Sequence, residues 1–140
     1  MAKFLIVPQI TLLVLPFVAG CSKGLSGTFE GAVRVAPGKT ESTDPAYTVA
    51  AVKKELESKN KRALTLNSDG TYTEIFGRGV QRGNWRVDGD KLILKDTESN
   101  GNPIYHGLQH EKIYRLAEGG REIITDEYKT YGLEFVLKKK

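Results

Sequence analysis

Short segments in which apolar and polar residues alternate run through most of the chain, and tight turns separate them. In residues 28–35, for example, Phe29 and Val33 lie on one face and charged residues on the other. An alternation with a period of two is typical of a β-strand that buries one face. Turn signals such as Asp88-Gly89 lie directly between two such segments and indicate hairpins. The pattern restricts the chain to antiparallel β-structure over most of its length.

About eight strands are expected from this pattern. They span residues 28–35, 63–67, 71–76, 80–87, 91–96, 111–116, 122–126 and 131–137. Many strands at short spacing predict either a sandwich or an up-and-down barrel. We favour a small antiparallel up-and-down barrel, because hairpin turns join neighbouring strands. The first and last strands are also both amphipathic, so they can pair with each other and leave no exposed edge.

One helix is expected after the first strand. Asp44 is a typical N-cap, and Pro45 suits the first helical position. Val49, Val52 and Leu56 are spaced by three and four residues, so they form one apolar stripe. The simpler interpretation is a helix that covers one side or end of the sheet. The alternative is a lid over a ligand cavity.

The first twenty residues differ in composition from the rest of the chain. Lys3 precedes a mostly apolar run at residues 4–17, and Val18-Ala19-Gly20 then leads to the single cysteine, Cys21. A positive start, an apolar run and small residues before a cleavage site are typical of a secretory signal peptide. The run is shorter than the about 20 residues of a membrane-spanning helix, and prolines interrupt it. We therefore interpret residues 1–20 as a signal peptide.

The sequence Val18-Ala19-Gly20-Cys21 resembles the lipobox of bacterial lipoproteins. The resemblance implies that lipid is attached to the Cys21 thiol and that residues 21–26 form a lipidated tether to a membrane. The alternative is an ordinary signal peptide with an inert cysteine. In Gram-negative lipoproteins an Asp after the cysteine retains the protein in the inner membrane, and here Ser22 follows. The resemblance thus implies an outer-membrane lipoprotein of the bacterial cell envelope that faces the periplasm; a Gram-positive source would place it outside the plasma membrane.

Three motifs resemble lipocalin-like bacterial lipoproteins: Asp69-Gly70-Thr71, Gly83-Asn84-Trp85 and Gly89-Asp90-Lys91-Leu92. The chain is similar to the amino-terminal domain of NlpE-type copper-resistance and envelope-stress lipoproteins. This resemblance implies a lipocalin-like barrel. Together with the expected strands, and with the helix that the residues themselves predict near residues 45–59, it gives one domain over residues 27–140. The NlpE-type domain has a Cys-x-x-Cys motif after its first strand, and this chain lacks it. Copper binding is therefore not implied, and no cofactor or metal is expected.

Composition narrows the classes of function. The chain has 140 residues, one cysteine and a net charge of +4. This length fits one domain, and a single cysteine excludes both a disulfide framework and a cysteine-based zinc module. The basic residues are spread along the chain, so we expect no nucleic-acid partner. No signature of a catalytic nucleophile is present. We therefore expect a non-enzymatic binding or interaction module with an envelope protein as its partner.

Six aromatic residues on strand faces are candidates for the barrel interior: Phe29, Tyr72, Phe76, Trp85, Tyr131 and Phe135. A barrel of eight strands is just wide enough to be filled by side chains or to hold one small ligand. We favour a packed core, because six rings would fill most of that space. One alternative is a lipocalin-type carrier in which these residues line a cavity for a small apolar ligand. A further alternative is an inhibitor of an envelope hydrolase that acts through a loop at residues 98–107.

Overall fold

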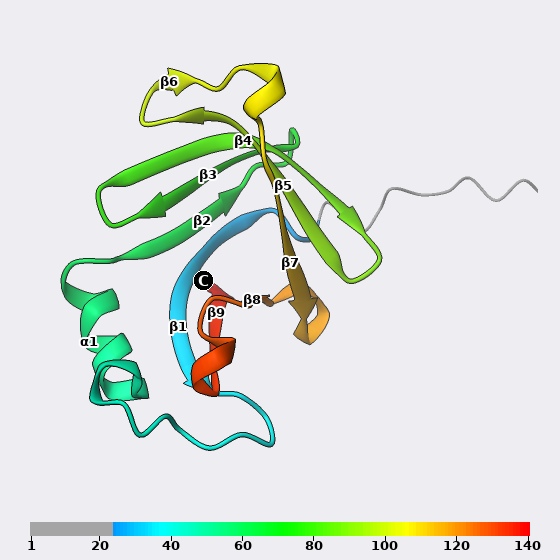
Figure 1. Cartoon of the computed structure of the whole chain (residues 1–140). Coiled ribbons are helices and arrows are strands. Elements are labelled where there is room, and N and C mark those ends of the chain that lie inside the picture. Colours follow the sequence, from blue (N-terminus) through cyan, green and yellow to red (C-terminus); the bar gives the residue numbers. More distant parts are fainter. Residues whose placement is uncertain (1–23) are drawn as a thin grey trace, which may run out of the picture.

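The computed structural model describes residues 24–140, and the expected signal peptide and Cys21 lie outside this range. Eight strands form a closed antiparallel barrel, with a ninth short strand at one edge (Figure 1). The strands are β1 (Gly27–Val35), β2 (Arg62–Leu66), β3 (Thr71–Phe76), β4 (Gly79–Asp88), β5 (Lys91–Ser99), β6 (Asn102–Pro103), β7 (Glu111–Ala117), β8 (Glu122–Thr125) and β9 (Leu133–Lys139). The helix α1 (Val49–Ser58) lies between β1 and β2 in the chain.

The order of strands around the barrel is β4-β3-β2-β1-β9-β8-β7-β5, and β4 pairs with β5 to close it. The predicted pairing of the first and last strands is present, with Val33 opposite Phe135 in the register of β1 and β9. The sequence-based prediction of a mostly β, antiparallel barrel of eight strands with one helix after the first strand is therefore confirmed. No helix in residues 24–140 is long and apolar enough to cross a membrane.

The helix is shorter than the sequence suggested. Asp44 caps a separate 3-10 turn, η1 (Pro45–Tyr47), by accepting a hydrogen bond from the Ala46 amide at 2.9 Å. Thr48 then has an extended backbone, and its hydroxyl accepts from the Ala51 amide at 3.2 Å. Thr48 is therefore the N-cap of α1, because a threonine oxygen can satisfy an amide of the first turn. The single expected helix is thus divided in two.

The last strand begins later than expected. Tyr131, which was assigned to a strand face, instead ends the 3-10 turn η4 (Lys129–Tyr131). Gly132 follows in a left-handed conformation with φ of 71°, which a glycine adopts without steric cost. The Tyr131 ring stacks on Tyr47 with centroids 3.6 Å apart. Because this turn precedes β9, Tyr131 packs against η1 and lies outside the core cluster.

The segment at residues 98–107 was expected to be a loop, and part of it is a hairpin. Strand β5 continues to Ser99 and pairs with β6. Asn100 and Gly101 form the turn, and both have positive φ, at 50° and 82°. An Asn-Gly pair at two positive φ angles is the usual composition of a tight hairpin turn. A 3-10 turn, η2 (His106–Leu108), follows β6.

The core of the barrel consists of aromatic and aliphatic side chains. Phe29 and Leu64 are fully buried, and Trp85 is 8% exposed. The cluster comprises Leu25, Phe29, Leu64, Leu66, Tyr72, Trp85, Leu92, Leu94, Tyr114, Ile123, Phe135 and Leu137. Gly83 permits the close approach of β4 to β5 at this point, because a Cβ there would collide with the Lys95 carbonyl and the Tyr72 ring.

Substitution of Gly83 tests this packing. We expect Gly83→Ala to lower the free energy of unfolding by about 1–3 kcal/mol, because backbone atoms of Lys95 cannot move aside freely. Gly107→Ala is the matched control, since no atom lies within 4 Å of the position of its Cβ, and we expect a change below about 0.5 kcal/mol. Urea unfolding of both variants measures the difference. Equal stability of the two variants would contradict the close approach of β4 and β5.

Candidate functional site

The inner face of the barrel changes from apolar to charged toward the end where β1 stops and β2 begins. Glu74 is fully buried there, while Arg62 and Asp96 are 6% and 7% exposed. Buried charges are costly unless each one is paired and hydrogen-bonded. We call Arg62, Glu74, Asp96, Lys112 and Tyr114 the interior charged cluster.

Glu74 is the centre of the interior charged cluster. Its Oε1 accepts hydrogen bonds from Arg62 Nη2 and from the Tyr114 hydroxyl, both at 3.1 Å. Its Oε2 accepts from Lys112 Nζ at 2.5 Å. These donors come from β2 and β7, which lie on different sides of the barrel. The carboxylate therefore joins strands that are not neighbours in the sheet.

Lys112 and Tyr72 link the cluster to β5. Lys112 Nζ lies 3.2 Å from Asp96 Oδ1, and the Tyr72 hydroxyl donates to the same carboxylate. Burial raises the pKa of Tyr72 well above its ordinary value of 10.0, and the hydrogen bond and charge of Asp96 add to this. Burial and the charge of Glu74 likewise raise the pKa of Tyr114. Both tyrosines therefore stay protonated and act as donors.

Arg62 connects the cluster to the surface. One nitrogen, Nη1, forms an ion pair with Glu127, which follows β8. The guanidinium carbon lies 3.8 Å from the centre of the Phe76 ring and 4.9 Å from that of Phe135. Its Nε is buried without a hydrogen-bond partner among the described residues. A cavity of about 200 Å³ lies at this end, lined by Arg62, both aromatic rings and Glu127, among others.

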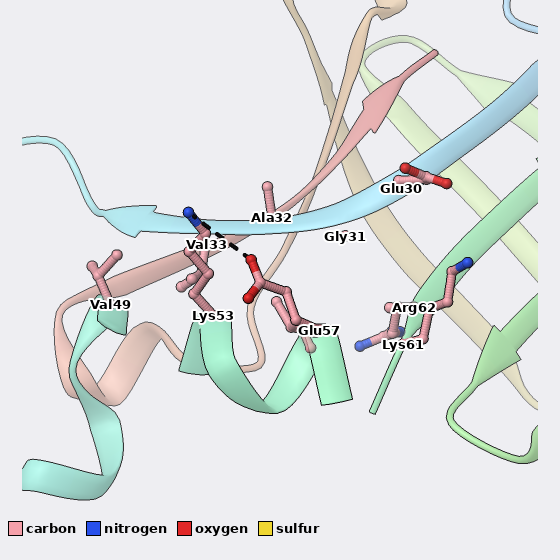
Figure 2. Close-up of a pocket in the computed structure, with 10 residues that line it drawn as sticks. Glu30, Gly31, Ala32, Val33, Val49, Lys53, Glu57, Lys61 and Arg62 are labelled. Carbon is pink, nitrogen blue, oxygen red and sulfur yellow. Dashed lines mark ion pairs between the residues drawn. The ribbon is translucent and has the colours of Figure 1, made fainter. Parts of the chain in front are cut away.

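A larger groove, which we call the α1–β1 groove, lies outside the barrel between the helix and the first strand. Its volume is about 550 Å³. In Figure 2 β1 runs along one side, α1 along the other, and Lys61 and Arg62 lie at one end. The lining residues are Glu30, Gly31, Ala32, Val33, Val49, Lys53, Leu56, Glu57, Lys61 and Arg62. Its walls are thus apolar in the middle and charged at the rim.

Most charges at the rim of the groove are compensated. Glu30 pairs with Lys140 at 2.6 Å, and Glu57 pairs with Lys53 at 4.0 Å. Arg62 is neutralised by Glu74 and Glu127. Lys61 is exposed and forms no ion pair with any residue of 24–140. The hydrogen bond from Lys140 lowers the pKa of Glu30, and the nearby charge of Lys61 adds to this. The groove therefore offers one exposed lysine that no ion pair holds.

The aromatic residues singled out from the sequence fall into three groups. Phe29, Tyr72, Trp85 and Phe135 belong to the core cluster. Phe76 packs on the guanidinium of Arg62, and Tyr131 lies on η4. None of the six lines the α1–β1 groove.

Sequence reasoning did not identify the charged cluster, although a signal was present. Tyr72 and Phe76 were assigned to one strand face, and Glu74 lies between them with the same parity. In the same way, Arg62 shares its parity with Leu64 and Leu66. A charged residue in the buried row of a strand is a candidate for an interior ion pair, since side chains of one parity share a face.

In residues 24–140 there is no group of three His, Cys, Asp or Glu side chains that could hold a metal ion. No family model, curated protein or solved structure matches the chain. Only the sequence and the geometry of the chain itself therefore bear on its function.

Removal of the central carboxylate tests the charged cluster. We expect Glu74→Gln to lower the free energy of unfolding by about 3–5 kcal/mol, because Arg62 and Lys112 each lose the fully buried one of their two carboxylate partners. Glu111→Gln is the control, since Glu111 pairs with Arg86 at the exposed surface, and we expect a cost below about 1 kcal/mol. Chemical unfolding measures both. A small effect of Glu74→Gln would mean that the cluster does not stabilise the barrel.

The raised pKa values of the two buried tyrosines predict how the free energy of unfolding depends on pH. The unfolded chain releases tyrosine protons near pH 10, whereas Tyr72 and Tyr114 keep theirs to higher pH in the folded state. The unfolded state thus binds fewer protons above pH 10, and stability falls as pH rises, by up to about 1.4 kcal/mol per pH unit for each tyrosine. We expect a shallower fall for the double variant Tyr72→Phe/Tyr114→Phe, measured by thermal unfolding between pH 9 and 11. Tyr105→Phe, at an exposed position, is the control. If stability falls as steeply with pH in the double variant as in the parent protein, Tyr72 and Tyr114 are not the cause of the fall.

Proposed function

We propose that this protein is a non-enzymatic binding module of the bacterial cell envelope. Lipid on Cys21 holds it at a membrane, on the periplasmic face of the outer membrane in a Gram-negative source, and the α1–β1 groove binds a partner. The observation that carries the proposal is the groove itself. It has a volume of about 550 Å³ and is open at the surface between α1 and β1 (Figure 2).

The geometry gives less support to a lipocalin-type carrier. Such a carrier holds its ligand in the barrel interior. Here the interior contains the apolar core cluster and, in contact with it through Tyr72 and Tyr114, the charged cluster around Glu74. A small apolar ligand in the place of the charged cluster would have to displace paired charges, which is costly.

The inhibitor alternative retains one favourable observation. Tyr105 is 82% exposed and Leu108 is 62% exposed, and both follow the β5–β6 hairpin. Large apolar side chains that gather in this way are typical of interaction surfaces. An envelope hydrolase could be bound through this hairpin and the turn η2 after it, so this surface is the second candidate.

Site-specific photo-crosslinking distinguishes the two surfaces. A benzoylphenylalanine at Lys53 places the reactive group at the rim of the groove, and one at Tyr105 places it on the second candidate surface. Asn84, exposed on β4, is the control position. In bacterial cells that produce the full-length chain, we expect a discrete adduct from Lys53 and none from Asn84. The added substitution Ala32→Trp should abolish this adduct, because it fills the groove.

An adduct from the probe at position 105, with none from the probe at position 53, would mean that the partner binds the hairpin surface and not the groove. Adducts of equal yield from all three positions, or none from any, would contradict a binding function for the groove. Cys21→Ala in the same cells should abolish incorporation of labelled fatty acid, and continued incorporation would refute the anchor.

A further inference from the structure

The edge of β1 that faces the groove is unpaired over its last residues. Strand β1 pairs with β9 from Phe29 to Val35, but with β2 only from Gly27 to Glu30. Arg62, the first residue of β2, still lies against Gly31, since a Cβ on Gly31 would be 3.4 Å from the Arg62 carbonyl oxygen. Beyond Gly31 β2 has no residues to pair, because the chain before Arg62 belongs to the connection from α1. In Figure 1 α1 lies beside β1 where a continued β2 would be expected.

The hydrogen-bond register of β1 with β9 shows which backbone groups of β1 have no partner strand. The Ala36 amide donates to the Gly132 carbonyl at 2.9 Å, and the Lys140 amide donates to the Thr28 carbonyl at 3.0 Å. Both bonds fit the register of β1 with β9, so even-numbered residues of β1 direct their amides and carbonyls toward β9. Odd-numbered residues direct theirs to the opposite side. Val33 and Val35 therefore present amides and carbonyls to the side that β2 has left.

On this side no strand of residues 24–140 pairs with Val33 or Val35, and no backbone bond from a turn or loop of these residues reaches the same amides and carbonyls. Val33 also lines the groove, and Val35 is 37% exposed. A row of unpaired amides and carbonyls is a template for another extended chain. Here it runs beside a helix, and the gap between them is the groove.

We propose that the α1–β1 groove binds an extended peptide segment, which adds as a strand to the free edge of β1. This inference rests on the proposed function, since it names what the groove binds. Backbone hydrogen bonds to Val33 and Val35 supply the pairing, and alternate side chains of the peptide enter the apolar middle of the groove. The free edge from Ala32 to Val35 spans about 10 Å, at about 3.3 Å per residue.

The charge of the groove adds a preference in the sequence of the peptide. Lys61 forms no ion pair with a described residue, whereas the other charged groups at the rim are paired. A peptide with an Asp or Glu near the end of the groove at Lys61 gains an attraction that weakens as salt is added. The segment is therefore apolar at alternate positions and acidic at one end.

Selection from a phage-displayed library of linear heptapeptides on the immobilised full-length chain supplies the probe. A selected peptide is then synthesised, and its affinity is measured for two variants at one position. Val33→Pro removes the amide that faces the groove but none of the bonds to β9, and proline is tolerated at such an edge. Val33→Ala is the matched control, because it keeps the amide. We expect about tenfold weaker binding to Val33→Pro than to Val33→Ala.

A second measurement leaves the protein unchanged. N-methylation of the selected peptide at one amide at a time removes its donors in turn. Strand addition predicts that methylation weakens binding at every second position only, since alternate amides face β1. This test remains valid if Val33→Pro does not fold.

The results separate this inference from the proposed function. Suppose that a peptide crosslinks to the probe at position 53, but its affinity is unchanged by Val33→Pro and methylation shows no alternation along its sequence. This result would overturn strand addition and would leave binding in the groove intact. If no selected peptide crosslinks to the probe at position 53, strand addition is overturned as well. Absence of any adduct at Lys53 in cells would instead contradict the proposed function.

Discussion

The unequal pairing of β1 with its two neighbours determines the functional end of this barrel. Strand β9 follows β1 to Val35, whereas β2 leaves it after Glu30. The helix α1 and its connections occupy the chain between the two strands, so the gap is closed by a helix and not by a strand. The groove, its apolar middle and the unpaired backbone of Val33 all follow from this parting of β1 and β2.

Arg62 lies where β1 and β2 separate, and its contacts stabilise the barrel at that place. It is the first residue of β2, and its ion pair with Glu74 joins that start to β3. Its second ion pair, with Glu127, reaches the segment after β8, and the Phe76 and Phe135 rings lie close to its guanidinium. An interior charged cluster of this kind is stable only when its members are present together. The cluster therefore joins β2, β3, β5 and β7 beside the hydrophobic core.

Alternation of apolar residues was sufficient to predict the strands and the closure, because each strand buries one face of the same core. It was not sufficient for details that depend on local caps. Thr48 separates η1 from α1. Gly132 ends the turn η4 in a left-handed conformation, so that Tyr131 lies on this turn and not on β9. The groove could not be predicted, since the extent of pairing between β1 and β2 depends on where α1 packs. The charged cluster could have been predicted from Glu74, whose parity places it in the buried row of β3.

Amide hydrogen exchange in the full-length chain without ligand tests the central claim most directly. Exchange reports which amides are held in the ladder and which are free. If β1 has an unpaired edge, the amides of Val33 and Val35 should exchange at least about tenfold faster than those of Ala32 and Arg34, which face β9. Equal protection of all four amides would show that another part of the chain already pairs with this edge, and the groove would then be no site for an added strand.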